Sequence, residues 1–190
     1  MFATRWPTVA RHLGFDAATA ELSALADGAV WIWNRIGEEF PEAEQVLDVY
    51  HAIEHVADAT KQYLGEGTTV QREQLQRGRE RLLADGHEGI VVWLGEVSQL
   101  PGAAGGDGAA LGKMLNYLTE HRERLNYALR LHRGQSIGSG MVEGAAKNLI
   151  GRRLKANNAR WLVRNLNNMC TPCCCLYSVA WSNYWEMQWN

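Results

Sequence analysis

Two short motifs combine residue types and spacings that could carry hydrolytic chemistry. The first, GQSIG at residues 134–138, fits the G-x-S-x-G turn that presents the nucleophile of many serine hydrolases. That turn needs a histidine base placed after the serine in the chain, but all six histidines precede Ser136. The segment before the motif is not an apolar strand either. We therefore interpret this match as a chance feature of a glycine-rich turn.

The second motif is HAIEH, which fits the inverted zinc-protease signature H-x-x-E-H with His51, Glu54 and His55. On a helix, the two histidines would lie one turn apart on one face and could share a Zn²⁺ ion. Glu54 could then act as a general base toward a metal-bound water. A third ligand would come from downstream, with Glu120 and Glu123 as candidates. A zinc hydrolase therefore stays open as one interpretation.

Three acidic residues stand beside predicted breaks in secondary structure. Asp27 follows a short apolar run and precedes Gly28, Asp48 lies inside a predicted strand, and Glu143 follows a glycine-rich turn. Carboxylates from separate elements can converge on two divalent cations about 4 Å apart, which is the arrangement that two-metal phosphoryl transfer needs. Spacing alone equally favours a simpler role for Glu143, which would stabilise a helix N-terminus.

The surroundings of Glu143 favour phosphate chemistry. It is the only acid over residues 130–185, and that segment has a net charge of +7. Residues 1–66 have a net charge of −7, so the overall charge of −2 is the sum of an acidic N-terminal segment and a basic C-terminal segment. A basic segment of this kind is a candidate for contact with nucleic acid, although it could also be an ordinary solvated surface.

The elements that must position these residues are mostly helical. We predict strands near residues 21–26 and 45–50, from short apolar or Val- and Tyr-rich runs, although the first run could also be the end of a helix. Residues 90–100 could form a helix or a strand, and 101–108 read as a flexible joint. Helical periodicity is predicted over residues 29–40, 51–64, 69–84 (as an exposed helix), 111–131, 141–154 and 161–184. The predicted fold class is α/β and helix-dominant.

Composition excludes several classes of protein. A chain of 190 residues with 46% hydrophobic residues can bury one real core. No apolar run reaches membrane-spanning length, and the N-terminal residues lack the apolar stretch of a secretory signal. The four cysteines stand at 170, 173, 174 and 175, a spacing that suits free thiols in a reducing cytoplasm better than disulfides.

Longer motifs occur along the chain in a fixed order. They are DGAVWIWN at 27–34, FP at 40–41, LDVYH at 47–51, IGSGMVE at 137–143, GRRLK at 151–155 and CCLYS at 174–178. Together they resemble bacterial insertion-sequence transposases of the ISKra type, over roughly residues 20–190. Several long motifs in one order are far more specific than a five-residue match.

This resemblance implies a DDE-type transposase with a ribonuclease-H-like core. In that family three carboxylates bind two Mg²⁺ or Mn²⁺ ions, which activate water and then a DNA 3′-hydroxyl for attack on phosphodiesters. The resemblance makes Asp27 the second carboxylate and Glu143 the third, both metal ligands. Asp48, His51 and His55 match positions that would support the site, which also accounts for the HAIEH motif without zinc.

The resemblance also implies a domain layout and partners. We expect one catalytic domain with a lead-in at 1–20, a core at 21–64, a helical insertion at about 65–136, and C-terminal core helices at 137–190. The partners would be transposon ends and target DNA, self-association is possible, and the protein would be cytoplasmic and associated with the nucleoid. The residues expected to contact DNA are Lys147, Arg152, Arg153, Lys155 and Arg160.

One part of the family pattern is missing from these residues. The first carboxylate of the family lies on the first core strand, well before the second one. Asp16 is the only acid among the first 20 residues and stands only 11 positions before Asp27, which leaves no room for the intervening strands. We therefore expect a truncated catalytic domain that is inactive alone. The alternative is a non-catalytic remnant that binds DNA or itself.

Overall fold

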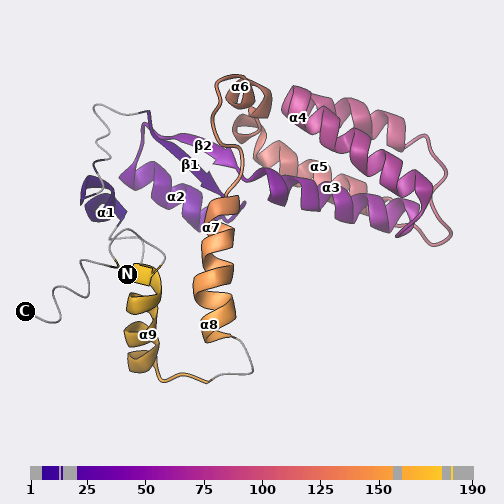
Figure 1. The fold of residues 1–190 in the computed structure, drawn as a ribbon. Helices are drawn as coiled ribbons and strands as arrows, with labels where there is room; N and C mark the ends of the chain where they lie inside the picture. Colours follow the sequence, from indigo (N-terminus) through magenta and orange to yellow (C-terminus); the bar gives the residue numbers. More distant parts are fainter. Residues whose placement is uncertain (1–5, 13, 15–20, 156–159, 177–180, 182–190) are drawn as a thin grey trace, which may run out of the picture. The chain divides into compact units, whose positions relative to one another are not determined.

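The computed structural model describes residues 6–12, 14, 21–155, 160–176 and 181 (Figure 1). The chain divides into two compact units, residues 1–138 and 139–190. The chain is helix-dominant and contains one small parallel sheet, as the predicted α/β class requires. Within the described segments, no helix combines the length and the apolar character that crossing a membrane requires.

The sheet of the first unit is a βαβ unit that follows α1 (Trp6–His12). Strands β1 (Ser23–Ala26) and β2 (Glu44–Leu47) pair in parallel, with Ser23 opposite Glu44 and Ala26 opposite Leu47. The connecting helix α2 (Val30–Glu39) buries Trp33 and Ile36, which lie one turn apart on its inner face. The predicted strand near 21–26 and the predicted helix over 29–40 are both confirmed.

The second strand ends earlier than predicted. It stops at Leu47, and α3 (Val49–Leu64) begins two residues later, so Asp48 lies between strand and helix. The Asp48 carboxylate accepts hydrogen bonds from the backbone amides of Tyr50 (2.8 Å) and His51 (3.2 Å). This N-cap outweighs the β propensity of Val49 and Tyr50, because it satisfies amides that the first helical turn leaves unpaired.

Helix α4 (Thr69–Val97) is a helical hairpin that folds back at Gly86. Gly86 has φ 57° and ψ −130°, which divides α4 into a first arm over 69–85 and a second arm over 87–97. The indole nitrogen of Trp93 donates to the backbone carbonyl of Gln74 at 3.1 Å, so the two arms run side by side in opposite directions. Residues 90–100 are thus mainly helical.

The first arm of α4 is less exposed than we predicted. Leu82 is fully buried, and Gly78 lies where α3 and the second arm of α4 come closest. A Cβ atom at Gly78 would lie 2.9 Å from Val56 Cγ1 and 3.0 Å from Trp93 Cε2. The charged residues of the arm therefore lie on its outer face, while Gly78, Leu82 and two glutamines, Gln71 and Gln74, are buried on its inner face.

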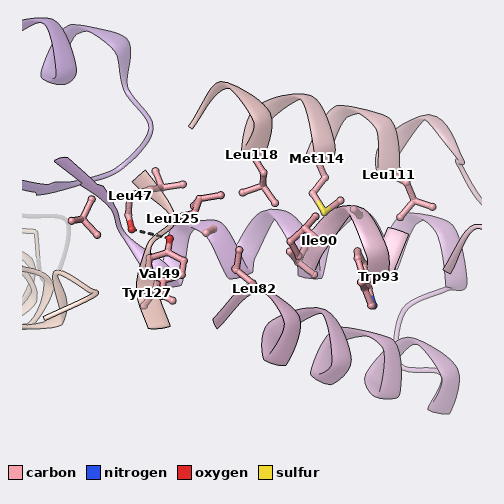
Figure 2. Close-up of a cluster of buried hydrophobic side chains, with 14 of the residues drawn as sticks. Leu47, Val49, Leu82, Ile90, Trp93, Leu111, Met114, Leu118, Leu125 and Tyr127 are labelled. Carbon is pink, nitrogen blue, oxygen red and sulfur yellow. Dashed lines mark hydrogen bonds between the residues drawn. The ribbon is translucent and has the colours of Figure 1, made fainter. Parts of the chain in front are cut away.

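The predicted helix over 111–131 is interrupted. It is divided into α5 (Ala109–Glu120), a 3₁₀ turn η2 (Arg122–Arg124) and α6 (Tyr127–His132). The break brings the Leu125 carbonyl against the α4 fold, where a Cβ at Gly86 would lie 2.7 Å from its oxygen. Helices α3, α4 and α5 enclose one core, shown in Figure 2, that includes Ile90, Trp93, Leu111, Met114 and Leu118. Residues 65–136 are mainly helical.

The second unit contains α7 (Gly140–Ala145), a π-helical turn η3 (Ala146–Gly151), α8 (Arg152–Leu154) and α9 (Val163–Leu176). The first three form the helix predicted over 141–154. Helix α9 begins close to the predicted start at 161 and contains Pro172. Of the rest of the predicted helix, 177–180 and 182–184 lie outside the described residues. Cys170, Cys173, Cys174 and Cys175 all lie in α9.

Candidate functional site

Asp27 and Asp48 lie side by side at the carboxyl end of the sheet. Asp27 directly follows β1 and Asp48 directly follows β2, and the two strands are parallel and in register up to Ala26 and Leu47. The backbone amide of Asp48 donates to the carbonyl of Ala26 at 2.9 Å, which continues the pairing to this point. Ligand sites of α/β folds lie at this edge, beyond the carboxyl ends of the strands.

The two carboxylates have different surroundings. Asp27 is exposed, and its Oδ1 accepts a hydrogen bond from the backbone amide of Ala29 at 3.2 Å. Asp48 is only 2% exposed, and its carboxylate caps α3. Asp27 is therefore the carboxylate that a solvent-borne ligand can reach, whereas the Asp48 carboxylate is buried against the first turn of α3.

His51 and His55 lie one turn apart on α3, with ring centroids 5.8 Å apart. His51 Nδ1 lies 3.4 Å from the Glu54 carboxylate. The His55 ring stacks on Tyr117 of α5, with 3.8 Å between centroids and 21° between planes. Within the described segments, no three histidine, cysteine, aspartate or glutamate side chains gather closely enough to hold a metal ion. The side chain of Glu143 is not part of that set.

Helix α5 supplies site residues that sequence reasoning missed. Tyr117 and His121 pack edge to face with ring centroids 4.8 Å apart, and His121 lies 6.1 Å from the Trp33 ring of α2. The Arg124 guanidinium lies over Trp33 and reaches within 3.2 Å of His121 Nδ1. The signal in the sequence is the spacing of Tyr117 and His121, one helical turn apart, as in the His51–His55 pair.

Half-buried His55 and buried His121 are mainly neutral at pH 7. Burial lowers the pKa of His55 below its ordinary value of 6.5, nearby His51 lowers it further, and the acids on α3 oppose this. Burial also lowers the pKa of His121; Arg124 and His55 add to the effect, and Glu120 opposes it. Neutral rings can accept as well as donate hydrogen bonds.

Two tyrosines border the acids. Burial and the charge of Asp27 raise the pKa of Tyr117 to about 12, while the nearby Gly28 amide opposes the rise. The Tyr117 hydroxyl is buried and has no partner in hydrogen-bond geometry within the described part of the chain. Tyr127 donates from its hydroxyl to the Leu47 carbonyl at 2.9 Å (Figure 2), and burial followed by Asp48 raises its pKa. Both tyrosines are protonated at neutral pH.

Arg130 of α6 fixes the opposite, amino end of the sheet. Its side chain is 2% exposed, it pairs with Glu44, and Nη2 donates to Ser23 Oγ at 3.2 Å. Its Nε donates to the backbone carbonyl of Ser136 at 2.9 Å. Ser23 and Glu44 are the first residues of the two strands, so this one side chain holds both strands and the segment that leads to residue 138. Sequence reasoning gave Arg130 no role.

The predicted residues of the second unit lie on short helices. Glu143 belongs to α7, but its side chain and that of Arg153 lie outside the described part of the chain. Four predicted basic residues are exposed in or near η3 and α8: Lys147, Arg152, Lys155 and Arg160. The indole nitrogen of Trp161 donates to the Leu154 carbonyl at 3.0 Å, which ties the segment after α8 back to it.

A cavity of about 460 Å³ opens at the fold of α4, between the residues around Gly86 and those of η2 and α6. Its lining includes His87, Asn126 and Tyr127, but neither Asp27 nor the histidines of α3. This cavity is therefore separate from the carboxyl edge of the sheet.

Comparison of the chain with protein-family models, with curated proteins and with solved structures finds no match.

Proposed function

We propose that this chain belongs to the catalytic domain of a DDE-type DNA transposase and carries elements of a ribonuclease-H-like core. One observation carries the proposal: Asp27 is an exposed carboxylate directly after the first strand of a parallel βαβ unit. That is where the family resemblance expects the second metal-binding acid. The order of elements agrees with this, since a helical insertion follows and then the helix that contains Glu143.

The donor set suits Mg²⁺ or Mn²⁺. Asp27 offers the hard carboxylate oxygens that these ions prefer, Asp48 follows the neighbouring strand at the same edge of the sheet, and the family resemblance makes Glu143 a further ligand. His51 and His55 line the same region, and the lowered pKa of His55 keeps that ring from adding a repelling positive charge. When bound, a pair of such ions would activate the attacking oxygen and stabilise the charge that develops on the phosphodiester.

The second unit would hold the DNA backbone. Lys147, Arg152, Lys155 and Arg160 are exposed, Arg153 belongs to the same basic set, and Glu143 is the only acid over 139–185. Such a surface neutralises phosphates and releases bound counterions, so its affinity falls steeply as salt rises. Each phosphate contact contributes a slope of about −0.9 in a plot of log affinity against log salt concentration.

Metal binding by the purified chain tests the proposal. We expect Mn²⁺ binding, followed by electron paramagnetic resonance or calorimetry, to weaken at least about 10-fold in Asp27→Asn and in Glu143→Gln because each loses a charged ligand. The control is Glu38→Gln, an exposed acid of α2 that pairs with Arg35. If Asp27→Asn binds Mn²⁺ as well as the native chain, the assignment of Asp27 is wrong. Stoichiometric zinc that is lost in His51→Ala would instead favour a zinc hydrolase.

Activity and DNA binding give two further readouts. With two of the three family carboxylates, the 190-residue chain should leave duplex DNA uncut in Mg²⁺ or Mn²⁺. Robust cutting that Glu143→Gln abolishes would show that a complete site is present. DNA binding should lose affinity between 50 and 200 mM salt in the native chain, and Arg152→Ala should reduce the salt slope by about one. Arg72→Ala, an exposed change on α4, should leave that slope unchanged.

A further inference from the structure

The turn that carries Asp27 is in close contact with the helical insertion through one aromatic ring. A Cβ atom on Gly28 would lie 2.2 Å from Tyr117 Oη, 2.7 Å from Cε2 and 2.8 Å from Cζ. All three distances are shorter than any real Cβ contact, so the Tyr117 ring rests directly on the Gly28 backbone. The close approach of the Tyr117 ring requires a glycine at position 28, since only a residue without a side chain leaves room for the ring.

The Tyr117 ring is itself fixed on both sides. His55 of α3 stacks on it at 3.8 Å, and His121 packs edge-on at 4.8 Å. The neighbouring residue Leu118 is fully buried in the core of the insertion, which fixes the position of α5 along its axis. The ring therefore cannot move away from Gly28 without disturbing packing on two helices.

The Asp27 turn has little else to fix its direction. Strand β1 has only four residues, Asp27 is exposed, and its described carboxylate contact is to the amide of Ala29 two residues away. Short strands and exposed turns, which have few buried contacts, belong to the less stable parts of a fold. A rigid ring pressed on the residue after Asp27 removes part of that freedom.

We propose that Tyr117 is a positioning residue through which the helical insertion sets the direction of the Asp27 carboxylate. The contact between Tyr117 and Gly28 stands on the geometry alone, whereas its consequence for metal binding rests on the proposed function. In this arrangement the insertion takes part in assembling the site, because the helix that carries Tyr117 lies about 90 positions downstream of the acid that it orients.

A double-mutant cycle tests the contact. Gly28→Ala should lower the urea midpoint of the native chain, because the new methyl group collides with the ring. The same change should have little effect in a Tyr117→Ala background, where the space is free, but should remain costly in Tyr117→Phe, whose ring carbons still collide. Gly37→Ala on α2 is the control, since a Cβ there meets nothing within 4 Å. Additive effects of Gly28→Ala and Tyr117→Ala would overturn the proposal.

Mn²⁺ affinity tests the positioning role. Tyr117→Ala should weaken Mn²⁺ binding about 10-fold, as loss of a residue that orients a ligand commonly does, and Tyr117→Phe should retain most of the affinity. Trp93→Ala is a control for destabilisation alone: it removes a fully buried ring from the insertion core and should leave Mn²⁺ affinity unchanged.

The outcomes separate the two proposals. Native Mn²⁺ binding that Tyr117→Ala leaves intact would overturn the positioning role while leaving the proposed function standing. If the native chain binds no Mn²⁺, the proposed function fails and the positioning of Asp27 for metal fails with it. In that case, non-additive effects of Gly28→Ala and Tyr117→Ala on stability would support the contact between the two residues but not its role in metal binding.

Discussion

The buried Arg130–Glu44 pair leads to a stability prediction that the structure makes quantitative. Arg130 is 2% exposed, so Glu44→Ala leaves its guanidinium charge buried, where its remaining acceptors among the described residues, Ser23 and Ser136, are neutral. Removal of one partner of a buried pair typically costs 3–5 kcal/mol. The Glu44 side chain is 34% exposed, which weakens the interaction through solvent screening, so we expect a loss of about 3 kcal/mol.

Replacing Arg130 instead of Glu44 should have a smaller electrostatic cost in the free energy of unfolding. Arg130→Met leaves behind Glu44, which can recover water at its exposed side and keeps a hydrogen bond from Asn126 at 2.6 Å. The double variant has no unpaired buried charge. It should therefore lose about 1–2 kcal/mol less than the sum of the two single variants, which is the signature of a direct interaction.

Urea unfolding followed by circular dichroism measures these differences in free energy. The matched control is Glu38→Ala, which removes an exposed pair with Arg35 on α2 and should cost less than about 1 kcal/mol. A loss for Glu44→Ala no larger than that of the control would refute the reasoning. So would strict additivity in the double variant, because it would show that Arg130 does not depend on Glu44.

Two further predictions concern protonation and backbone strain. Folding lowers the pKa of His55 and His121 below 6.5, so just below that pH the unfolded chain binds more protons than the folded chain. The free energy of unfolding should therefore fall as the pH drops from about 6.5. A flat series of urea midpoints between pH 5 and 8 would contradict this. Gly86→Ala should lower the free energy of unfolding by about 1–3 kcal/mol, because φ at this position is 57° and the new Cβ would meet the Leu125 carbonyl. An unchanged thermal midpoint would argue against the fold-back of α4.

Local signals predicted the part of the fold that carries the first acid. The apolar run before Asp27, the break at Gly28 and the periodicity over 29–40 correctly predicted β1, the turn and α2. The error at Asp48 was also local. A Val- and Tyr-rich run favours a strand, but an aspartate at its centre can cap a helix, and periodicity does not indicate which of these two effects prevails.

The rest of the site depends on contacts between distant segments. The apolar periodicity continues through the break between α5 and α6, because Leu125 is buried although the helix ends at Glu120. Only the three-dimensional structure places Tyr117 on Gly28 and Arg130 on Ser23, pairs separated by 89 and 107 positions. No pattern within a helix or strand reports such pairs, so these residues had no signal strong enough to single them out.

Because α4 folds back at Gly86, the first unit combines contacts between near neighbours in sequence with contacts between distant segments. The arms of the hairpin meet through near neighbours, since Gln74 and Trp93 are 19 positions apart. The sheet is fixed by Arg130 across 86 and 107 positions, so its two strands depend on the whole insertion being folded. Local closure costs less chain entropy than closure over such spans. Loss of the Arg130 side chain should therefore loosen the two strands that lead into Asp27 and Asp48, because this side chain connects their first residues to α6.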